Sequence, residues 1–229
     1  MKTRLLKTAF LDTVPVMTGY LCLGCGFGIL LQENGLGLGW ALLMSTCIYA
    51  GSAQYLLVGL LSSGASQISV ALSTLLVNIR HLFYGLSVID TYRDAGKRKS
   101  YMIFALTDET YSLVTQAKFP EGIQKSSYCF LVSLLNQCYW ILGSVAGSAI
   151  GTLIPMDFTG VSFVLTALFV TIFVAQGLST KDHGPAIVGV ACTTVCLLLF
   201  GKDWFLIPSM AAIVGLLLLR YRKEGFRNE

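Results

Sequence analysis

Long stretches without a charged residue dominate this sequence. Val14 to Gln32 contains no Asp, Glu, Lys or Arg, and neither does the longer run from Gly35 to Ile79. A helix crosses the hydrocarbon core of a bilayer with about 20 apolar residues, so the first run can span once and the second about twice. Only 12% of the residues are charged, about half the share in a soluble domain. We therefore expect residues 1–229 to form a single integral membrane domain.

Further hydrophobic segments continue this pattern toward the C-terminus. Polar residues from Ser62 to Gln67 divide the long run in two. After a basic loop at Asp90 to Ser100, the segments expected to be helical are Tyr101 to Ala117, Ser126 to Ile154, Phe158 to Thr180, Pro185 to Gly201 and Trp204 to Leu219, with breaks at Pro155, Lys181 to Gly184 and Lys202-Asp203. The sequence predicts an all-α fold, a polytopic membrane helix bundle. It has about seven or eight hydrophobic segments, one or two of them broken or re-entrant.

The positive charges lie beside the apolar segments. The net charge is +4, and the basic residues gather near the N-terminus, in Arg93 to Lys99 and in Arg220 to Arg227. Short basic flanks of this kind mark cytoplasmic loops, so we expect the lipid bilayer, and not nucleic acid, as the partner. Three plain crossings from a cytoplasmic N-terminus would place the Arg93 to Lys99 loop outside. One resolution makes an early segment re-entrant and has Tyr101 to Ala117 dip into the membrane without crossing it. The other places the N-terminus outside, and both remain open.

The sequence lacks the usual motifs of metal and cofactor sites. All seven cysteines lie inside hydrophobic runs, which favours apolar packing over a disulfide framework. Histidine occurs only at positions 81 and 183, so a histidine-rich metal site is not expected. Neither a cofactor nor a catalytic metal is predicted. The first hydrophobic segment has no clean cleavage site, and we expect it to stay in the protein.

One hydrophobic segment carries a patch of small residues that ends in an amide. The patch reads Tyr49-Ala50-Gly51-Ser52-Ala53-Gln54. Such residues allow a membrane helix to break and to offer free backbone groups to a solute. They also allow two helices to pack closely, and both interpretations remain open. Under the first interpretation the candidate substrate-binding residues are Tyr49, Gly51, Ser52 and Gln54.

Arg80 is a fixed cation about two helical turns, or roughly 13 Å, from the nearest loop. An ionised group at membrane depth is costly, so it usually faces a partner or a wet cavity. One interpretation is that the planar guanidinium binds a substrate carboxylate in a bidentate manner. The other is a structural arginine that reaches the interface or pairs with Asp108. On a helix Arg80 lies in a polar stripe with Asn78, His81 and Tyr84, and we add Asn78 and Tyr84 to the candidate substrate-binding residues.

Three titratable residues are candidates for proton coupling. Asp108 and Glu109 point about 100° apart on a helix, so one can face inward while the other faces water. His81 titrates near neutral pH when unperturbed. It could relay protons, or it could simply hydrogen-bond a backbone carbonyl. Proton coupling through Asp108 is the hypothesis.

Five short motifs follow one another along the chain. They are Val14-Pro15-x-x-x-Gly19-Tyr20, Gly26-Phe27-Gly28-Ile29-Leu30, Tyr49-Ala50-Gly51-Ser52-Ala53-Gln54, Asn78-x-Arg80-His81-x-x-Tyr84-Gly85 and Leu106-Thr107-Asp108-Glu109-Thr110. In this order they resemble the large subunit of the AzlC-type branched-chain amino-acid exporters (the LIV-E family). The resemblance runs from about Ala9 to Gln176.

The resemblance implies a function that the residues alone do not reveal. It implies export of leucine, isoleucine and valine, with methionine as a further candidate, across the bacterial inner membrane. It also implies energy from the proton gradient and a second, short hydrophobic subunit of the AzlD type. The residues independently favour a buried cation among small and apolar positions, and an aliphatic zwitterion fits such surroundings.

Two functions of other classes compete with transport. The chain could be an intramembrane enzyme that uses Asp108, Glu109 or His81, or a membrane partner that stabilises another subunit without transporting anything itself. No two of the candidate catalytic groups have the spacing of a known motif. We therefore predict that the chain is not an enzyme.

Overall fold

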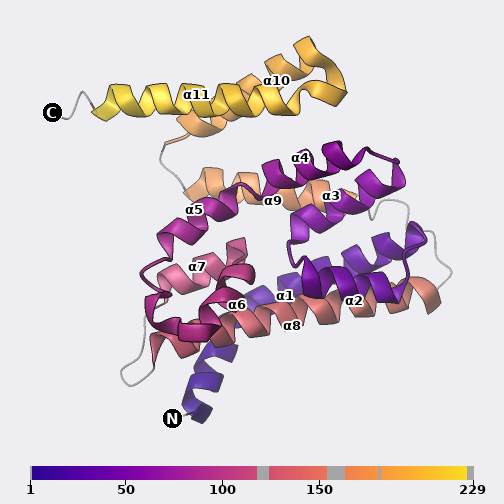
Figure 1. Cartoon of the computed structure of the whole chain (residues 1–229), viewed down its shortest axis with the longest axis vertical. Coiled ribbons are helices and arrows are strands. Elements are labelled where there is room, and N and C mark those ends of the chain that lie inside the picture. The colour runs from indigo at the N-terminus through magenta and orange to yellow at the C-terminus, as the bar shows by residue number, and fades with distance from the viewer. Residues whose placement is uncertain (1, 118–123, 154–162, 180–181, 226–229) are drawn as a thin grey trace. The chain divides into compact units, whose positions relative to one another are not determined.

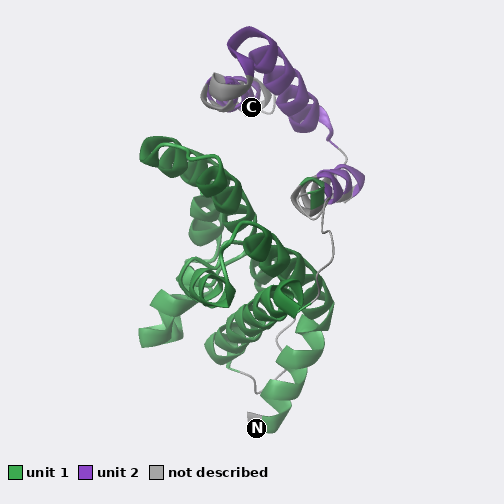
Figure 2. Ribbon diagram, turned by 90° about the vertical axis from the view of Figure 1, so that its right-hand side faces the viewer, with its two compact units in different colours: residues 1–166 green, residues 167–229 purple. Residues whose placement is uncertain are grey.

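The computed structural model of the chain describes residues 2–117, 124–153, 163–179 and 182–225. Every regular element among these residues is a helix (Figure 1), as the predicted all-α fold requires. The chain divides into two compact units, residues 1–166 and residues 167–229, coloured separately in Figure 2. The boundary falls within one helix, α9 (Phe163–Ser179). Each unit is described by itself.

The first unit contains two long helices and a series of short ones. The long helices are α1 (Lys2–Glu33) and α8 (Lys125–Leu153). The short elements between them are α2 (Leu38–Cys47), α3 (Gly51–Ser62), α4 (Gln67–Asn78), α5 (Arg80–Ser87), η1 (Arg93–Arg98), α6 (Lys99–Phe104) and α7 (Asp108–Gln116).

Among the described residues, 4 helices are long and apolar enough to cross a membrane. They comprise Thr3–Glu33, Gln67–Ser87, Lys125–Leu153 and Gly184–Gly201. The second of these joins α4 and α5, because Ile79 between them keeps right-handed helical geometry. Two other segments are each divided into two short helices, α2 and α3 in one and α6 and α7 in the other.

Glycines bring α1 and α8 into backbone contact, side by side in Figure 1. A Cβ added to Gly24 would lie 3.0 Å from the backbone of Ser144, and one added to Gly143 would lie 2.8 Å from the Tyr20 carbonyl. Gly28 and Gly147 approach the opposite helix in the same way. Each helix therefore carries glycines four residues apart, the pattern that lets membrane helices pack closely. The glycines of α1 at this contact therefore serve packing.

The helix break predicted at the small-residue patch is present. α2 ends at Cys47 and α3 begins at Gly51. Between them Tyr49 has a φ of 44°, the only positive φ of a non-glycine residue in the described part of the chain. A side chain in this left-handed region costs about 1–2 kcal/mol, so the surroundings must hold the break in place.

A second break interrupts the segment that was predicted to run from Tyr101 to Ala117. α6 ends at Phe104, and α7 begins at Asp108. The Thr107 side chain accepts a hydrogen bond from the Thr110 backbone N–H at 3.3 Å. This is an N-cap, which threonine favours because its oxygen satisfies a free N–H of the first turn. The predicted apolar segment is therefore divided into two short helices, because the cap starts a new helix inside it.

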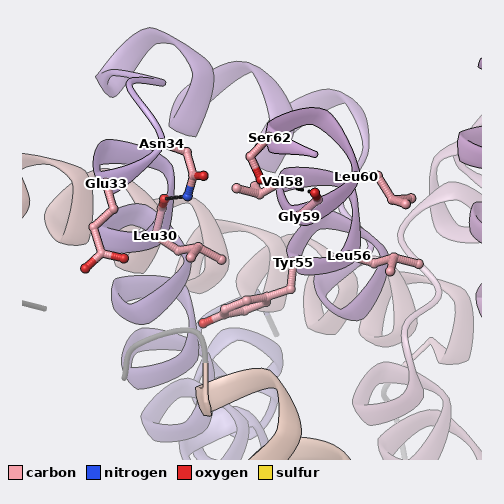
Figure 3. Close-up of a pocket in the computed structure, with 9 residues that line it drawn as sticks. All are labelled: Leu30, Glu33, Asn34, Tyr55, Leu56, Val58, Gly59, Leu60 and Ser62. Carbon is pink, nitrogen blue, oxygen red and sulfur yellow. Dashed lines mark hydrogen bonds between the residues drawn. The ribbon is translucent and has the colours of Figure 1, made fainter. Parts of the chain in front are cut away.

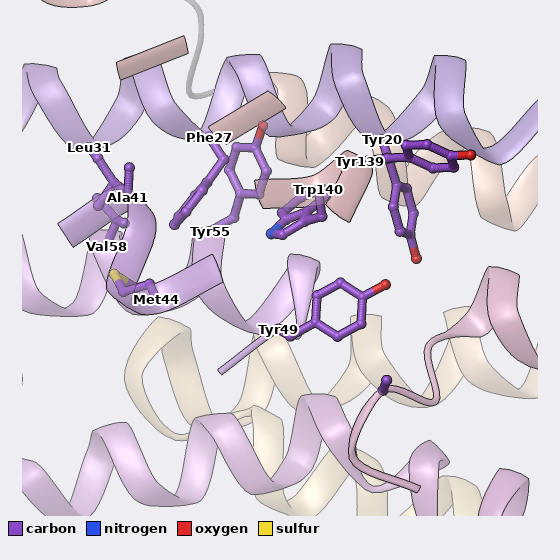
Figure 4. Packing of buried hydrophobic residues seen from close by; sticks show 11 residues of the cluster. Tyr20, Phe27, Leu31, Ala41, Met44, Tyr49, Tyr55, Val58, Tyr139 and Trp140 are labelled. Carbon is purple, nitrogen blue, oxygen red and sulfur yellow. The ribbon is translucent and has the colours of Figure 1, made fainter. Parts of the chain in front are cut away.

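A buried aromatic cluster fills the space where α1, α2, α3 and α8 meet (Figure 4). Phe27 of α1 lies 6.1 Å from Trp140 of α8 and 5.5 Å from Tyr55 of α3, between ring centroids. Tyr20 meets Trp140 edge to face at 5.5 Å. Edge-to-face and offset pairs of this kind add about 0.5–1.5 kcal/mol each beyond burial. The cluster also includes Tyr49 and Ala105, so it packs against both helix breaks.

The second unit consists of most of α9 together with α10 (Gly184–Trp204) and α11 (Leu206–Gly225). The Asp182 carboxylate accepts a hydrogen bond from the Gly184 N–H at 2.9 Å and forms an ion pair with Arg220 at 2.8 Å. This contact joins the start of α10 to α11. The predicted break at Lys202-Asp203 lies instead at Gly201, where φ is 71°. The predicted break at Pro155 is outside the described residues, as is Lys181 of the break before α10.

Candidate functional site

Three short helices meet at the guanidinium of Arg80. One terminal nitrogen, Nη1, lies 2.9 Å from Asp108 Oδ2. The other, Nη2, donates to Ser52 Oγ at 3.0 Å. The side chains of Arg80 and Asp108 are only 31% and 27% exposed, so the pair is largely shielded by protein. Arg80 thus joins α5 to the first turns of α3 and α7.

Both helices that reach Arg80 do so with their N-terminal ends. Ser52 is the second residue of α3, and Asp108 is the first residue of α7. A helix N-terminus carries about half a positive charge, because its first N–H groups have no partner in the helix. No side chain caps α3. Two such ends and a guanidinium together form a strongly anion-attracting region, which Asp108 partly neutralises.

The neighbouring carboxylate has different surroundings. Glu109 Oε2 lies 2.6 Å from the hydroxyl of Tyr20, which is also 2.7 Å from Thr107 Oγ1. Tyr20 is buried in α1, with 5% of its surface exposed. Tyr49, from the break between α2 and α3, interacts electrostatically with Glu109. The second carboxylate therefore lies where the two helix breaks and α1 meet.

Several buried polar atoms in this region have no hydrogen-bond partner of good geometry. Among the described residues they include Tyr49 Oη, Gln54 Nε2, Asn78 Oδ1, Arg80 Nε, Asp108 Oδ1 and Asn136 Oδ1. A buried polar group without a partner costs about 1–3 kcal/mol. Their concentration around Arg80 and the two breaks is typical of a site that binds polar groups.

Gln54 and Gly51 act within the α3 break. Gln54 Oε1 accepts a hydrogen bond from Trp140 Nε1 at 2.9 Å and from the Ala50 backbone N–H at 3.2 Å. A Cβ on Gly51 would lie 3.1 Å from the Trp140 ring. Of the two interpretations left open for this patch, the structure contains both, because the helix breaks here and also packs tightly. Gln54 holds the break with its oxygen and keeps its nitrogen unbonded.

The polar stripe on α4 and α5 is less uniform than the helical spacing suggested. Tyr84 interacts electrostatically with Arg80 and Asp108 and stacks on Tyr111 at 4.5 Å. His81 Nδ1 lies 3.1 Å from the Asn78 backbone oxygen, within its own helical turn. This is the simple backbone hydrogen bond that was the alternative to a proton relay. Tyr84 accordingly lies with Arg80 and Asp108, and the His81 ring meets the Tyr84 ring edge to face at 5.7 Å between centroids.

Some residues of the site were not singled out from the sequence. Tyr20 and Thr107 were recognised only as parts of motifs, and Trp140 not at all. For Thr107 a signal existed, because a threonine followed by two acidic residues is typical of a helix start. For Tyr20 and Trp140 no local signal exists, since their roles depend on contacts between distant helices.

Amides of α8 connect the second break to the rest of the unit. Asn136 Nδ2 donates to Thr110 Oγ1 at 3.0 Å. Gln137 donates to the Thr46 carbonyl at 3.1 Å and accepts from Tyr101 at 2.6 Å. These amides therefore join α8 to the short helices.

A cavity of about 420 Å³ lies between the end of α1 and the second half of α3 (Figure 3), and neither Arg80 nor its partners Asp108 and Ser52 line it. Its lining residues are Leu30, Glu33, Asn34, Tyr55, Leu56, Val58, Gly59, Leu60 and Ser62. Ser52 and Val58 are six residues apart, or roughly 9 Å along the axis of α3. The cavity is therefore not the polar site. In the described part of the chain, no three His, Cys, Asp or Glu side chains gather in a way that could hold a metal ion.

Comparisons with known proteins point in one direction. The profile of a family described as "AzlC protein" matches residues 15–154. The "Branched-chain amino acid transport protein AzlC" of Bacillus subtilis is 38% identical over 92% of this chain and 83% of its own. An "Uncharacterized membrane protein" of Helicobacter pylori is 40% identical over 95% of both chains. The "Inner membrane protein YgaZ" of Escherichia coli is 25% identical over 90% of this chain and 84% of its own. No solved structure gives a significant match.

Proposed function

Because the chain belongs to the AzlC family of membrane proteins, we propose that it transports branched-chain amino acids across the bacterial inner membrane. The resemblance to this family, first drawn from five motifs, is confirmed by a match that covers four of them completely and nearly all of the first. The location in a membrane is confirmed by the membrane-protein relatives and the candidate spans. Transport of branched-chain amino acids is the activity in the name of the Bacillus subtilis relative.

The arrangement of Arg80 between the first turns of α3 and α7 is the observation that carries the proposal. Interrupted helices whose N-terminal halves point at an anionic group are a recurring substrate site in transporters. The carboxylate of an amino acid is such a group, and a guanidinium can bind it through two hydrogen bonds. Arg80 already holds Asp108 and Ser52 with two nitrogens, which is the geometry that a substrate carboxylate would use.

Asp108 supplies a physical route to proton coupling. When the substrate carboxylate takes over the guanidinium, Asp108 loses its cationic partner. A partly buried carboxylate without a cation binds a proton more readily. Substrate binding at Arg80 and proton uptake at Asp108 then favour each other, which links transport to the proton gradient.

A small hydrophobic subunit of the AzlD type is part of the proposal. α4 and α5 carry no buried residue, and large side chains such as Leu82, Phe83 and Leu86 are about two-thirds exposed. Apolar helices of this kind need lipid or another apolar helix around them. The helix that carries Arg80 is therefore open to such a partner along its outer side.

The test is reconstitution of the full chain in proteoliposomes, with and without the small subunit. Counterflow of leucine would be measured against lysine and glutamate, with and without a pH gradient. We expect leucine counterflow that exceeds that of both charged amino acids and that increases with a pH gradient. Absence of leucine counterflow from both preparations would refute transport by this chain. Product formed from leucine in detergent, without a gradient, would instead favour an enzyme.

A further inference from the structure

The charges around Arg80 do not balance. The region holds one cation, Arg80, and two consecutive carboxylates, Asp108 and Glu109. Arg80 forms its ion pair with Asp108. Glu109 forms no ion pair with any residue that the structure describes, and its hydrogen-bond partner is the neutral hydroxyl of Tyr20. One carboxylate of the region is therefore left without a cation.

Glu109 is held in place although it lacks a charged partner. Tyr20 is buried, its ring meets Trp140 edge to face, and its hydroxyl also contacts Thr107. The carboxylate oxygen that Tyr20 contacts is thus fixed relative to α1 and to the N-cap of α7. A partly buried carboxylate is costly in such surroundings unless a cation or a proton joins it. The position is fixed, and beyond the partial positive charge at the start of α7 the carboxylate has no cation among the described residues.

Tyr49 provides an independent sign of a ligand beside Glu109. Its side chain is 3% exposed, yet its hydroxyl has no hydrogen-bond partner of good geometry among the described residues. It interacts electrostatically with Glu109. A hydroxyl oxygen, like a carboxylate oxygen, can accept a hydrogen bond from an ammonium group. A buried hydroxyl that lies near the Tyr20 and Thr107 side chains without a hydrogen bond of good geometry therefore adjoins a carboxylate that lacks a cation.

We propose that Glu109, positioned by Tyr20 and aided by the hydroxyl of Tyr49, binds the α-ammonium group of the substrate. This inference rests on the proposed function, because it assigns the second charged group of the same substrate. Asp108 and Glu109 are consecutive in the first turn of α7. The guanidinium that Asp108 holds and the cation that Glu109 would bind therefore both lie at the start of α7, and an α-amino acid carries its two charges close together in the same way. A zwitterion brings one charge to Arg80 and the opposite charge to Glu109.

This assignment makes protons and substrate compete for Glu109. The sequence suggested Glu109 only as a proton-coupling residue, and a proton on it would satisfy the same uncompensated charge. The ammonium group can bind only when Glu109 is deprotonated. A proton on Glu109 then weakens leucine binding while leaving the carboxylate contact at Arg80 intact. Selectivity for amino acids over their deaminated analogues is the direct consequence.

The test compares leucine with two analogues that each lack one charged group. The probes are 4-methyl-2-oxopentanoate, which has a keto group in place of the ammonium, and 3-methylbutylamine, which has no carboxylate. Binding would be measured on the purified full chain in nanodiscs, for the wild type, Glu109→Gln and Tyr20→Phe. We expect Glu109→Gln to weaken leucine binding by roughly 10- to 100-fold, the range for a hydrogen bond to a charged group. Binding of the keto acid should be unchanged or tighter.

The analogues keep the two proposals separable. The keto acid reports on a folded protein with an intact Arg80 even when the amine contact is lost. Equal weakening of leucine and keto acid in Glu109→Gln would overturn the ammonium assignment while leaving transport in place. No leucine binding by the wild type would count against the proposed function itself. Tyr20→Phe should give a smaller loss, for leucine only, and a loss for both probes would assign Tyr20 a structural role.

Discussion

The guanidinium of Arg80 and the carboxylate of Asp108 lie 2.9 Å apart, and each residue stands at the first position of its helix. Arg80 is the first residue of α5, and Asp108 is the first residue of α7. The pair therefore joins two helix starts across the unit. Its separation is the event on which substrate binding and proton uptake depend in the proposed cycle, and the first two predictions concern it.

Arg80→Lys should impair leucine transport while the protein remains in the membrane. Lysine keeps the charge but offers one point of contact, so it cannot hold a carboxylate through two parallel hydrogen bonds. We expect leucine counterflow to fall by about tenfold or more, with the amount of protein in the membrane unchanged. The matched control is Arg93→Lys, at an arginine whose side chain is 78% exposed. Full counterflow by Arg80→Lys would rule out the carboxylate contact.

Asp108→Asn should separate transport from the proton gradient. Asparagine keeps the shape of aspartate and cannot take up a proton at neutral pH. We expect exchange of leucine for leucine to persist, while accumulation driven by a pH gradient is lost. Both activities would be measured in the same proteoliposomes. Gradient-driven accumulation at the wild-type level in this variant would show that another residue carries the proton.

Glycines at the contact of α1 and α8 should tolerate no side chain. Gly147→Ala would bring a methyl group against the backbone of Cys25, and Gly143→Ala would bring one to about 2.8 Å from the Tyr20 carbonyl. Overpacking of this kind costs about 1–3 kcal/mol, and we expect a lower melting temperature in detergent. The control is Gly19→Ala, where nothing lies within 4 Å of the new methyl group. That variant should be neutral or slightly more stable, since alanine favours helix.

Asp182 should stabilise the second unit in a pH-dependent manner. The Gly184 N–H, and after it Arg220, hold the pKa of Asp182 below its ordinary value. The contribution to stability is therefore complete above the ordinary pKa of about 4 and is lost as the pH falls through the lowered pKa. We expect Asp182→Ala to lower the melting temperature at pH 7, and the difference from the wild type to shrink as the pH falls below the ordinary pKa. Asp90→Ala, which removes an exposed ion pair with Arg93, should have little effect at either pH.

The sequence offered the first helix break as one of two interpretations, because its cause is local. Small residues between Tyr49 and Ser52 favour an interruption wherever they stand in a membrane segment. The second break also has a local cause, the N-cap at Thr107, but that signal was overlooked within an apolar run. For Arg80 the sequence allowed two partners, and the structure contains the pair with Asp108. Whether the pair opens to a substrate depends on energies that spacing does not encode.

Contacts between distant helices could not be predicted. Nothing near Tyr20 indicates that its hydroxyl meets Glu109, because 89 residues separate the two in the chain. The same holds for Trp140 and Gln54, which are 86 residues apart. The glycine patterns of α1 and α8 are visible in the sequence, but which helix each pattern faces is decided by the packing of the whole unit. Helical spacing also grouped His81 with Arg80, although its ring turns back to its own turn.

Two helices locked together through their main chains cannot slide past each other without unfolding that seam. Whatever rearrangement exposes a cargo first to one side of the bilayer and then to the other must therefore be carried by the short helices around it. α4 and α5 bury no side chain, so a shift of these two helices breaks few buried contacts. The cation they carry would then travel with them, while the carboxylates of α7, tied to α1 and α8, remain where they are.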